Sequence, residues 1–162
     1  MEYEHTQRGY WHYLLFVFAA GSLVAAWSLR DELAGHYACL GMALIFIVCG
    51  MSFMQLTVRD EQDALAVRFG PLPLFFTRIR YEKICSAKPG RCSLLDGWGI
   101  HYLPGRGTTY NIWGFSCVRI DAERRTIRIG TDDVEGLVEF LQQRIEAQRV
   151  QSPTACAGPS HA

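Results

Sequence analysis

The sequence predicts an N-terminal transmembrane helical hairpin followed by an α+β domain, in which short antiparallel strands precede one C-terminal helix. Residues 9–29 and 33–58 contain no Asp, Glu, Lys or Arg. Each stretch is at least as long as the roughly 20 residues that cross a bilayer as a helix. After residue 56, apolar and polar residues alternate, as they do in strands that face water on one side. One amphipathic helical pattern follows these strands.

Both apolar stretches are predicted to span the membrane. Aromatic side chains favour the headgroup level, and they stand at both ends of the first stretch: Tyr10, Trp11, Tyr13 and Trp27. Only "RDELAG" connects the two stretches. A cleaved signal peptide before a single anchor is the alternative, but the chain starts with two acids and lacks a small-x-small cleavage site. We therefore expect a short N-terminal segment, residues 1–9, and a two-helix transmembrane hairpin over residues 10–56.

Two spans place both ends of the chain on one side of the membrane. Near the membrane this side has Arg8, Arg59 and Arg68, whereas the turn between the spans has Arg30 next to two acids. Basic residues favour the cytoplasmic side. We therefore expect a protein of the inner (cytoplasmic) membrane, with its soluble domain and both termini in the cytoplasm.

The six cysteines fit a reducing compartment better than a metal site. The chain has no Cys-x-x-Cys pair, and the spacing of Cys85 and Cys92 lacks the close ligand pairing of a zinc site. No metal is predicted. Residues 57–162 contain 14 Lys and Arg against 12 Asp and Glu, and this near balance gives no reason to expect a nucleic-acid partner.

Residues 54–130 are predicted to form seven or eight short strands. The segments "DALAVRFG", "FTRIRY", "CVRID" and "TIRIG" alternate with a period of two, and turn-like segments such as "RDEQD", "GPLP" and "LPGRG" separate them. About ten residues per strand suggests a sandwich or a partly open barrel.

One helix is predicted to close the domain. Its apolar stripe has helical spacing and consists of Val134, Leu137, Val138, Leu141 and Ile145. Thr131 or Asp132 is expected to cap the first amides, and Gly136 interrupts the pattern. After this helix the composition changes to small residues and proline. We therefore expect the domain to cover residues 57–147 and residues 148–162 to be a disordered tail.

The glycine run at residues 97–114 raises the question of phosphate binding. Gly105-x-Gly107 resembles part of a dinucleotide-binding fingerprint, which needs a helix directly after the glycines. Here "TTYNIW" alternates as a strand does. Residues 104–107 are therefore predicted to be a hairpin loop whose glycines supply positive φ angles, and no cofactor is expected.

No catalytic motif occurs in the sequence. No Ser, Cys or carboxylate stands at a diagnostic spacing from His101, and Arg106 is expected to be a solvated charge at a loop tip. Nucleophile elbows, HExxH and phosphate-binding loops are lacking. The sequence therefore does not predict an enzyme.

Several segments together resemble the bacterial PH-like domains. "LTVRDEQDALAVRFGPLPLFFTRIRYEKI" resembles the opening of these domains, and "GWGIHY", "TTYNIWG", "VRID" and "RIGTDDVEGLVEFL" resemble the later half of the group's small membrane-anchored members. The resemblance covers about residues 54–145. It implies a PH-like domain, a seven- to eight-stranded antiparallel sandwich or partly open barrel capped by one C-terminal helix. A two-span hairpin before the domain is typical of such proteins, whereas the motifs imply no particular activity.

Eukaryotic relatives of this fold often bind phosphoinositides through a basic loop between the first two strands. In this chain the loop is "RDEQD", with three acids against one base, so recognition of inositol phosphates there is not expected. The basic residues are instead concentrated in and after the next strands and form a candidate lipid-facing surface or a solvated strand face: Arg78, Arg80, Lys83, Lys88 and Arg91.

The sequence thus supports two hypotheses of function. The first is a membrane-anchored interaction or scaffold module that binds a protein through a sheet edge or through the hairpin at the glycine run, with the candidate residues His101, Pro104, Gly105, Arg106 and Gly107. The alternative is a domain that contacts anionic lipids of the bilayer through the basic residues. The small residues Gly21 and Ala25 also permit homo-oligomers through the spans, without further support.

Overall fold

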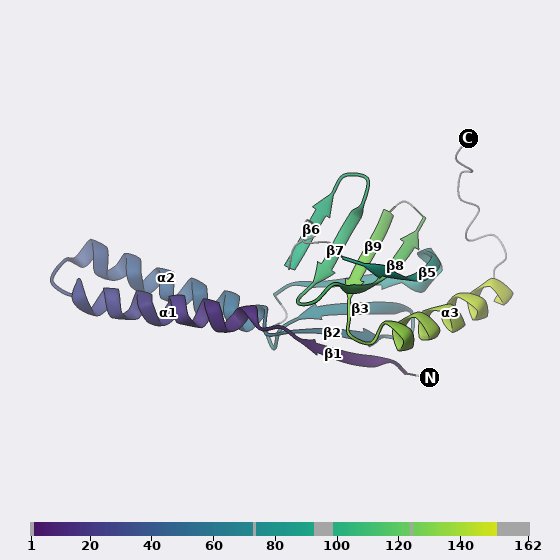
Figure 1. Ribbon diagram of the computed structural model, residues 1–162, viewed down its shortest axis with the longest axis horizontal. Helices are drawn as coiled ribbons and strands as arrows, with labels where there is room; N and C mark the ends of the chain where they lie inside the picture. The colour runs from purple at the N-terminus through teal and green to yellow at the C-terminus, as the bar shows by residue number, and fades with distance from the viewer. Residues whose placement is uncertain (1, 73, 93–98, 124, 152–162) are drawn as a thin grey trace.

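The computed structural model describes residues 2–72, 74–92, 99–123 and 125–151. In this part of the chain, a pair of long helices projects from a domain of two β-sheets that also contains the C-terminal helix (Figure 1). The architecture is therefore an apolar helix pair followed by an α+β domain, as the sequence predicts.

The helix pair consists of α1 (Trp11–Ser28) and α2 (Leu33–Ser52). Both helices are long and apolar enough to cross a membrane. Small residues bring them together, because a Cβ atom at Gly50 would lie 2.6 Å from Cε1 of Phe16. The rings of Phe18 and Phe46 stack with their centroids 5.6 Å apart. Most of the remaining apolar side chains face outward, unlike those of a helix in a protein core.

The first sheet has the strand order β1-β2-β3-β4 and is antiparallel throughout. Its strands are β1 (Glu4–Arg8), β2 (Gln55–Asp60), β3 (Ala64–Phe69) and β4 (Phe76–Arg80). Strand β1 is a difference from the sequence analysis, which treated residues 1–9 only as a segment before the hairpin. The sequence "EHTQR" is polar throughout, so it has no apolar alternation, and its pairing with β2 joins residues far apart in the chain.

The second sheet has the strand order β5-β8-β9-β7-β6. It follows a short 3₁₀ turn, η1 (Tyr81–Lys83), and consists of β5 (Ile84–Arg91), β6 (Gly99–Leu103), β7 (Gly107–Asn111), β8 (Ser116–Ala122) and β9 (Arg125–Gly130). The prediction of seven or eight strands over residues 54–130 is confirmed, with eight in the described part.

The prediction of an entirely antiparallel domain was wrong at one pair of strands, because β7 and β9 run parallel. Strand β8 lies on the far side of β9. The chain therefore passes from β7 to β8 before it returns antiparallel as β9, which points the same way as β7. Two hairpins, β6–β7 and β8–β9, are thus joined edge to edge.

The core lies between the two sheets and α3 (Val134–Gln151). The predicted apolar stripe is confirmed, since Leu137, Val138, Leu141 and Ile145 are buried and Val134 packs against the core. Helix α3 runs beyond residue 147, so residues 148–151 are helical rather than part of a disordered tail. The rest of that predicted tail, residues 152–162, lies outside the described residues.

The N-terminal cap of α3 is Asp133, not Thr131 or Asp132 as the sequence suggested. The amide of Gly136 donates to Oδ1 of Asp133 at 3.1 Å, while Thr131 Oγ1 accepts from the amide of Asp133 at 3.1 Å. A Cβ atom at residue 136 would lie 2.4 Å from Oδ2 of Asp133. The glycine that interrupts the helical pattern therefore makes room for the cap.

Residues 99–111 of the glycine run form the β6–β7 hairpin, which confirms the predicted bend. Gly105 and Gly107 have φ angles of +79° and +88°, and the amide of Arg106 donates to the carbonyl of Leu103 at 3.0 Å. A strand, not a helix, follows the glycines.

The two glycines of this hairpin allow a matched test. A Cβ atom at Gly107 would lie 1.9 Å from the carbonyl oxygen of Thr126, whereas a Cβ atom at Gly105 would have no described neighbour within 4 Å. We expect Gly105→Ala to cost about 1 kcal/mol through its positive φ alone, and Gly107→Ala to cost more than about 2 kcal/mol because β9 must also shift. Unfolding of the full chain in detergent, followed by far-UV circular dichroism, measures both. Equal losses would contradict the close approach of β7 and β9.

Candidate functional site

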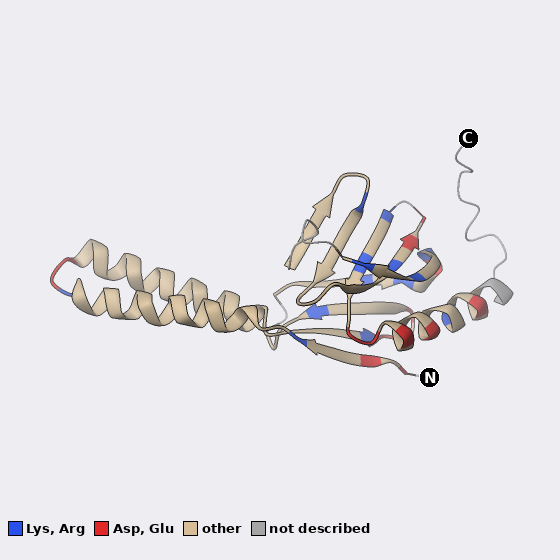
Figure 2. Cartoon of the chain, viewed as in Figure 1, with Lys and Arg blue, Asp and Glu red and all other residues tan. Residues whose placement is uncertain are grey.

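Charge is unevenly distributed over the molecule. The helix pair has charged residues only at its turn, whereas the β domain and α3 have both signs (Figure 2). Within the domain, charges gather around the end of β2 at Asp60. This end is about 16 Å from Gln55, where the chain leaves the helix pair, because strands rise about 3.3 Å per residue. We call it the far end of the domain.

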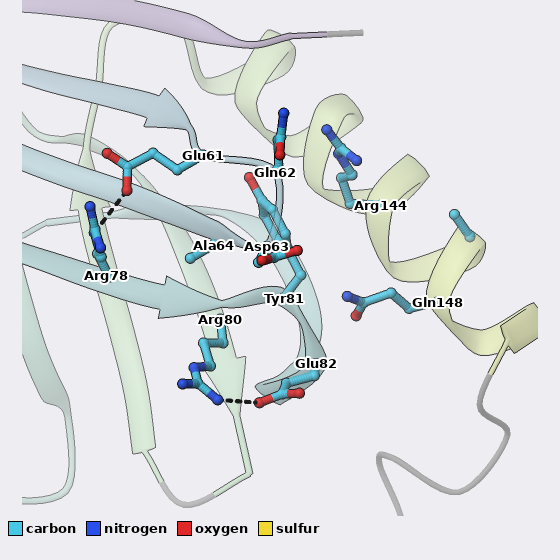
Figure 3. Close-up of a pocket in the computed structure, with 11 residues that line it drawn as sticks. Glu61, Gln62, Asp63, Ala64, Arg78, Arg80, Tyr81, Glu82, Arg144 and Gln148 are labelled. Carbon is cyan, nitrogen blue, oxygen red and sulfur yellow. Dashed lines mark hydrogen bonds and ion pairs between the residues drawn. The ribbon is translucent and has the colours of Figure 1, made fainter.

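A cleft of about 680 Å³ opens at the far end, between the β2–β3 turn, η1 and α3 (Figure 3). Its lining has three carboxylates and three guanidinium groups, together with amides: Glu61, Asp63, Glu82, Arg78, Arg80, Arg144, Gln62 and Gln148. Three segments far apart in the sequence therefore contribute to one polar site.

Arg144, which lines the cleft, forms an ion pair with a buried carboxylate beside it. The side chain of Asp60 is 3% exposed and pairs with the guanidinium of Arg144 on α3. The same carboxylate accepts a hydrogen bond from the hydroxyl of Tyr81 at 2.8 Å and from the backbone amide of Gln62 at 3.0 Å. The Arg144 guanidinium also lies over the rings of Tyr81 and Phe140, 5.5 and 5.4 Å from their centroids. Such a pair withstands burial only when its hydrogen bonds are satisfied, and here it fastens α3 to the β2–β3 turn and η1.

Tyr81 is the group whose ionisation this environment alters. Burial of the ring raises the pKa of its hydroxyl above the ordinary value, and the hydrogen bond to the Asp60 carboxylate raises it further. The hydroxyl therefore stays protonated as the donor of this cluster.

The rim of the cleft is more exposed. Arg78 Nε lies 2.8 Å from Oε2 of Glu61, and Arg80 pairs with Glu82 at 3.3 Å. The carboxylate of Asp63 has no hydrogen bond or ion pair within the described part of the chain. The groups that line the cleft can exchange hydrogen bonds and ion pairs with a ligand of mixed charge. Apart from the half-polar ring of Tyr81 and two alanines, the described lining consists of carboxylates, guanidinium groups and amides.

Three of the five predicted lipid-facing residues line one groove. Arg78, Arg80 and Lys83 line a shallow groove of about 270 Å³ at the far end, together with Arg125 and Glu123 of the β8–β9 turn. Lys88 and Arg91 are elsewhere, on β5, opposite Arg119 and Ser116 of β8. The structure thus brings three of the five together and adds one arginine that the sequence analysis did not select.

The predicted partner-binding hairpin is separate from the cleft. His101 is exposed on β6, which is an edge strand of its sheet. Pro104 and Gly105 are exposed at the tip, and Arg106 and Gly107 are half-buried. The carbonyl of Arg106 accepts a hydrogen bond from Arg128 at 3.1 Å. These residues therefore form a supported loop, well away from α3 (Figure 1).

The sequence analysis missed Asp60, Tyr81 and Arg144. One signal was available, because Asp60 follows Leu56 and Val58 with a period of two and so falls on the buried face of β2. An acid at such a position needs a buried partner. Nothing in the local sequence indicates that the partner comes from α3, 84 residues further along the chain.

No family model matches the chain, and no curated protein is significantly similar to it. The proposal of function therefore rests on the architecture and on the geometry of the far end.

The buried ion pair has a direct effect on stability. Arg144→Met leaves the Asp60 carboxylate buried without its cation, and we expect a loss of about 3 kcal/mol. Arg78→Met is the matched control, since Arg78 is exposed and Glu61 keeps Arg68 as a second partner, so this loss should be less than about 1 kcal/mol. Urea unfolding of the full chain in detergent measures both variants. If the two losses were equal, Arg144 would not hold α3 in place.

Tyr81 predicts how stability depends on pH. The folded chain holds the hydroxyl proton to higher pH than the unfolded chain, whose tyrosines titrate near pH 10. This contribution to stability is complete below about pH 10 and is lost at up to about 1.4 kcal/mol per pH unit above it. Tyr81→Phe should therefore make the free energy of unfolding fall less steeply between about pH 10 and pH 12. At neutral pH the variant should lose about 1 kcal/mol through the missing hydrogen bond. Parallel slopes in urea titrations of the two proteins would exclude the proton on Tyr81 as the cause.

Proposed function

We propose that the protein is a membrane-anchored binding module. The helix pair spans the cytoplasmic membrane, and the β domain is a PH-like domain that binds a protein segment in the cleft at its far end. The observation that carries this proposal is that both ends of the helix pair continue directly into neighbouring, paired strands of the domain.

The connection between helices and domain is short on both sides. Strand β1 ends at Arg8 and α1 begins at Trp11, while α2 ends at Ser52 and β2 begins at Gln55. Arg8 lies opposite Gln55 in the sheet, and the amide of Gly9 donates to the carbonyl of Met54 at 3.0 Å. A domain joined by a flexible linker samples many orientations. Two paired strands instead fix the domain relative to the anchor.

The dimensions of the helix pair support two spans. At 1.5 Å per residue, helices of 18 and 20 residues are about 27 and 30 Å long, close to the thickness of the hydrocarbon core. Trp27 and Tyr37 are exposed near the turn, and Tyr10 and Tyr13 near the domain. Aromatic side chains thus stand at both ends of the pair, where a bilayer has its headgroups.

The arrangement of the domain supports the PH-like assignment. Two sheets of four and five strands pack together with one C-terminal helix, which agrees with the resemblance apart from β1 and the parallel pair β7/β9. The β2–β3 turn is acidic, with Glu61 and Asp63 at the cleft. This composition supports a polypeptide ligand of mixed charge over an inositol phosphate.

The alternative function, contact with anionic lipid through basic residues, has less support. Arg78, Arg80 and Lys83 do share a groove, but they lie toward the end of the domain opposite the helix pair. Arg80 faces Ala64, and Arg78 faces Ala66, whereas Phe76 is at the other end of β4. A bilayer crossed by the helix pair would therefore be on the side away from this groove.

Photo-cross-linking in cells tests the binding cleft. A benzophenone side chain at Gln148, inside the cleft, should form a discrete adduct with a protein partner. The same group at Glu139, on an exposed part of the same helix, should not. Reversing two rim charges, with Asp63→Lys and Arg80→Glu, should remove the adduct because the ligand is held by complementary charges.

A third cross-linking position distinguishes the cleft from the predicted hairpin. Adducts from Tyr102, which is exposed on the edge strand β6, together with none from Gln148, would move the partner site to the predicted hairpin. If the adduct at Gln148 persisted after the charge reversal, recognition of the partner by the charged residues of the cleft would also be contradicted.

A further inference from the structure

Two loops of the domain are apolar and exposed. The β3–β4 loop with the start of β4, and the β7–β8 loop, contain no Asp, Glu, Lys or Arg. In their described residues, six large apolar side chains are 37–66% exposed. We call these six the apolar rim: Leu72, Leu74, Phe75, Phe76, Trp113 and Phe115.

The apolar rim adjoins the place where the helix pair enters the domain. On one side, the amide of Gly70 donates to the carbonyl of Gln55 at 2.6 Å, and the ring of Phe75 stacks on Phe53, the residue after α2, with centroids 5.8 Å apart. The β3–β4 loop is thus attached to the end of α2.

The β7–β8 loop adjoins the start of α1 in the same way. The side-chain amide of Gln7 donates to the carbonyl of Trp113 at 2.9 Å. The Trp113 ring lies edge-on to Tyr10, the residue before α1, with centroids 5.3 Å apart. The two sheets therefore each contribute one apolar loop beside the base of the helix pair.

The loops at the far end have the opposite composition. The β2–β3 turn has Glu61 and Asp63, the β8–β9 turn has Glu123, and β9 begins at Arg125. Figure 2 shows most charges of the domain away from the base of the helix pair. Arg8, opposite Gln55, and Arg68, opposite Thr57, are charged residues near this base. Soluble domains seldom group large exposed apolar side chains, and such a group marks a contact surface.

We propose that the apolar rim enters the headgroup and upper acyl region of the leaflet from which the helix pair emerges. The inference rests on the proposed spans, because it is their base that places the rim at the bilayer surface. Apolar faces of interfacial proteins reach about 5–10 Å below the headgroups, and Trp and Phe side chains partition there readily. Because the rim lacks charge, a zwitterionic phospholipid bilayer is sufficient as its partner.

Depth-dependent fluorescence quenching tests the proposal on the full chain in phosphatidylcholine vesicles. A nitrobenzoxadiazole label is placed on Phe76→Cys or Phe115→Cys, one in each half of the rim. Glu82→Cys, exposed at the far end, is the aqueous control, and Ala20→Cys, exposed in the middle of α1, is the membrane control. Native Cys92 and Cys117 are buried and can remain if replacing them prevents folding, while the other cysteines are replaced by Ala.

We expect lipids with a nitroxide near the headgroup to quench the label at both rim positions and leave the label at residue 82 unquenched. Aqueous iodide should give the reverse. If the labels at 76 and 115 behaved like the label at 82, while a nitroxide deep in the acyl chains quenched the label at 20, the spans would stand. The proposed insertion of the apolar rim into the leaflet would then be refuted. An unquenched label at 20 would instead refute the spans.

A second copy of the chain is the other occupant that could cover the rim. In that case the rim labels would be shielded from iodide, also in detergent, without quenching by nitroxide lipids. Cross-linking through Phe76→Cys would then give a covalent dimer. This outcome would also overturn the proposal.

Discussion

The rest of the structure depends on the antiparallel pairing of β1 with β2. Strand β1 leads into the first helix of the pair and β2 follows the second. Their ladder runs from Arg8 opposite Gln55 to Glu4 opposite Arg59. The ladder closes the base of the helix pair and begins the first sheet at the same time. The register of this sheet therefore sets the orientation of the domain relative to the helix pair.

The same ladder gives the domain two different ends. Near the helix pair, loops without charge pack on Phe53 and Tyr10. At the other end of β2, Asp60 is held by Arg144 and Tyr81, two residues that line a cleft with both signs of charge. A buried carboxylate needs its partners in a fixed geometry, so the polar end is also the place where α3 is fastened.

Local patterns in the sequence predicted what local interactions determine. The apolar runs predicted both helices of the pair, the period of two predicted β3, β4, β7, β8 and β9, and the stripe from Val134 to Ile145 predicted α3. The glycines of the β6–β7 hairpin were also identified by their surroundings. In each case neighbouring residues along the chain contain the information.

The remaining features depend on residues that meet only in the folded chain. The polar strand β1 has no pattern of its own and exists because β2 offers an edge. The parallel pair β7/β9 follows from the order of two hairpins. The Asp60 cluster joins a turn, η1 and α3, and the apolar rim joins loops from two sheets. A pattern within one segment does not specify which other segment it meets.

The position of β1 has a consequence for the order of biosynthesis. Residues 9–54 separate β1 from β2 along the chain, and the helix pair lies within them. Strand β1 leaves the ribosome first, but its partner is made only after both apolar helices. Strand β1 can therefore join the first sheet only after both helices have been made and have turned back toward it. If the helix pair spans the membrane as proposed, insertion of the pair precedes completion of this sheet.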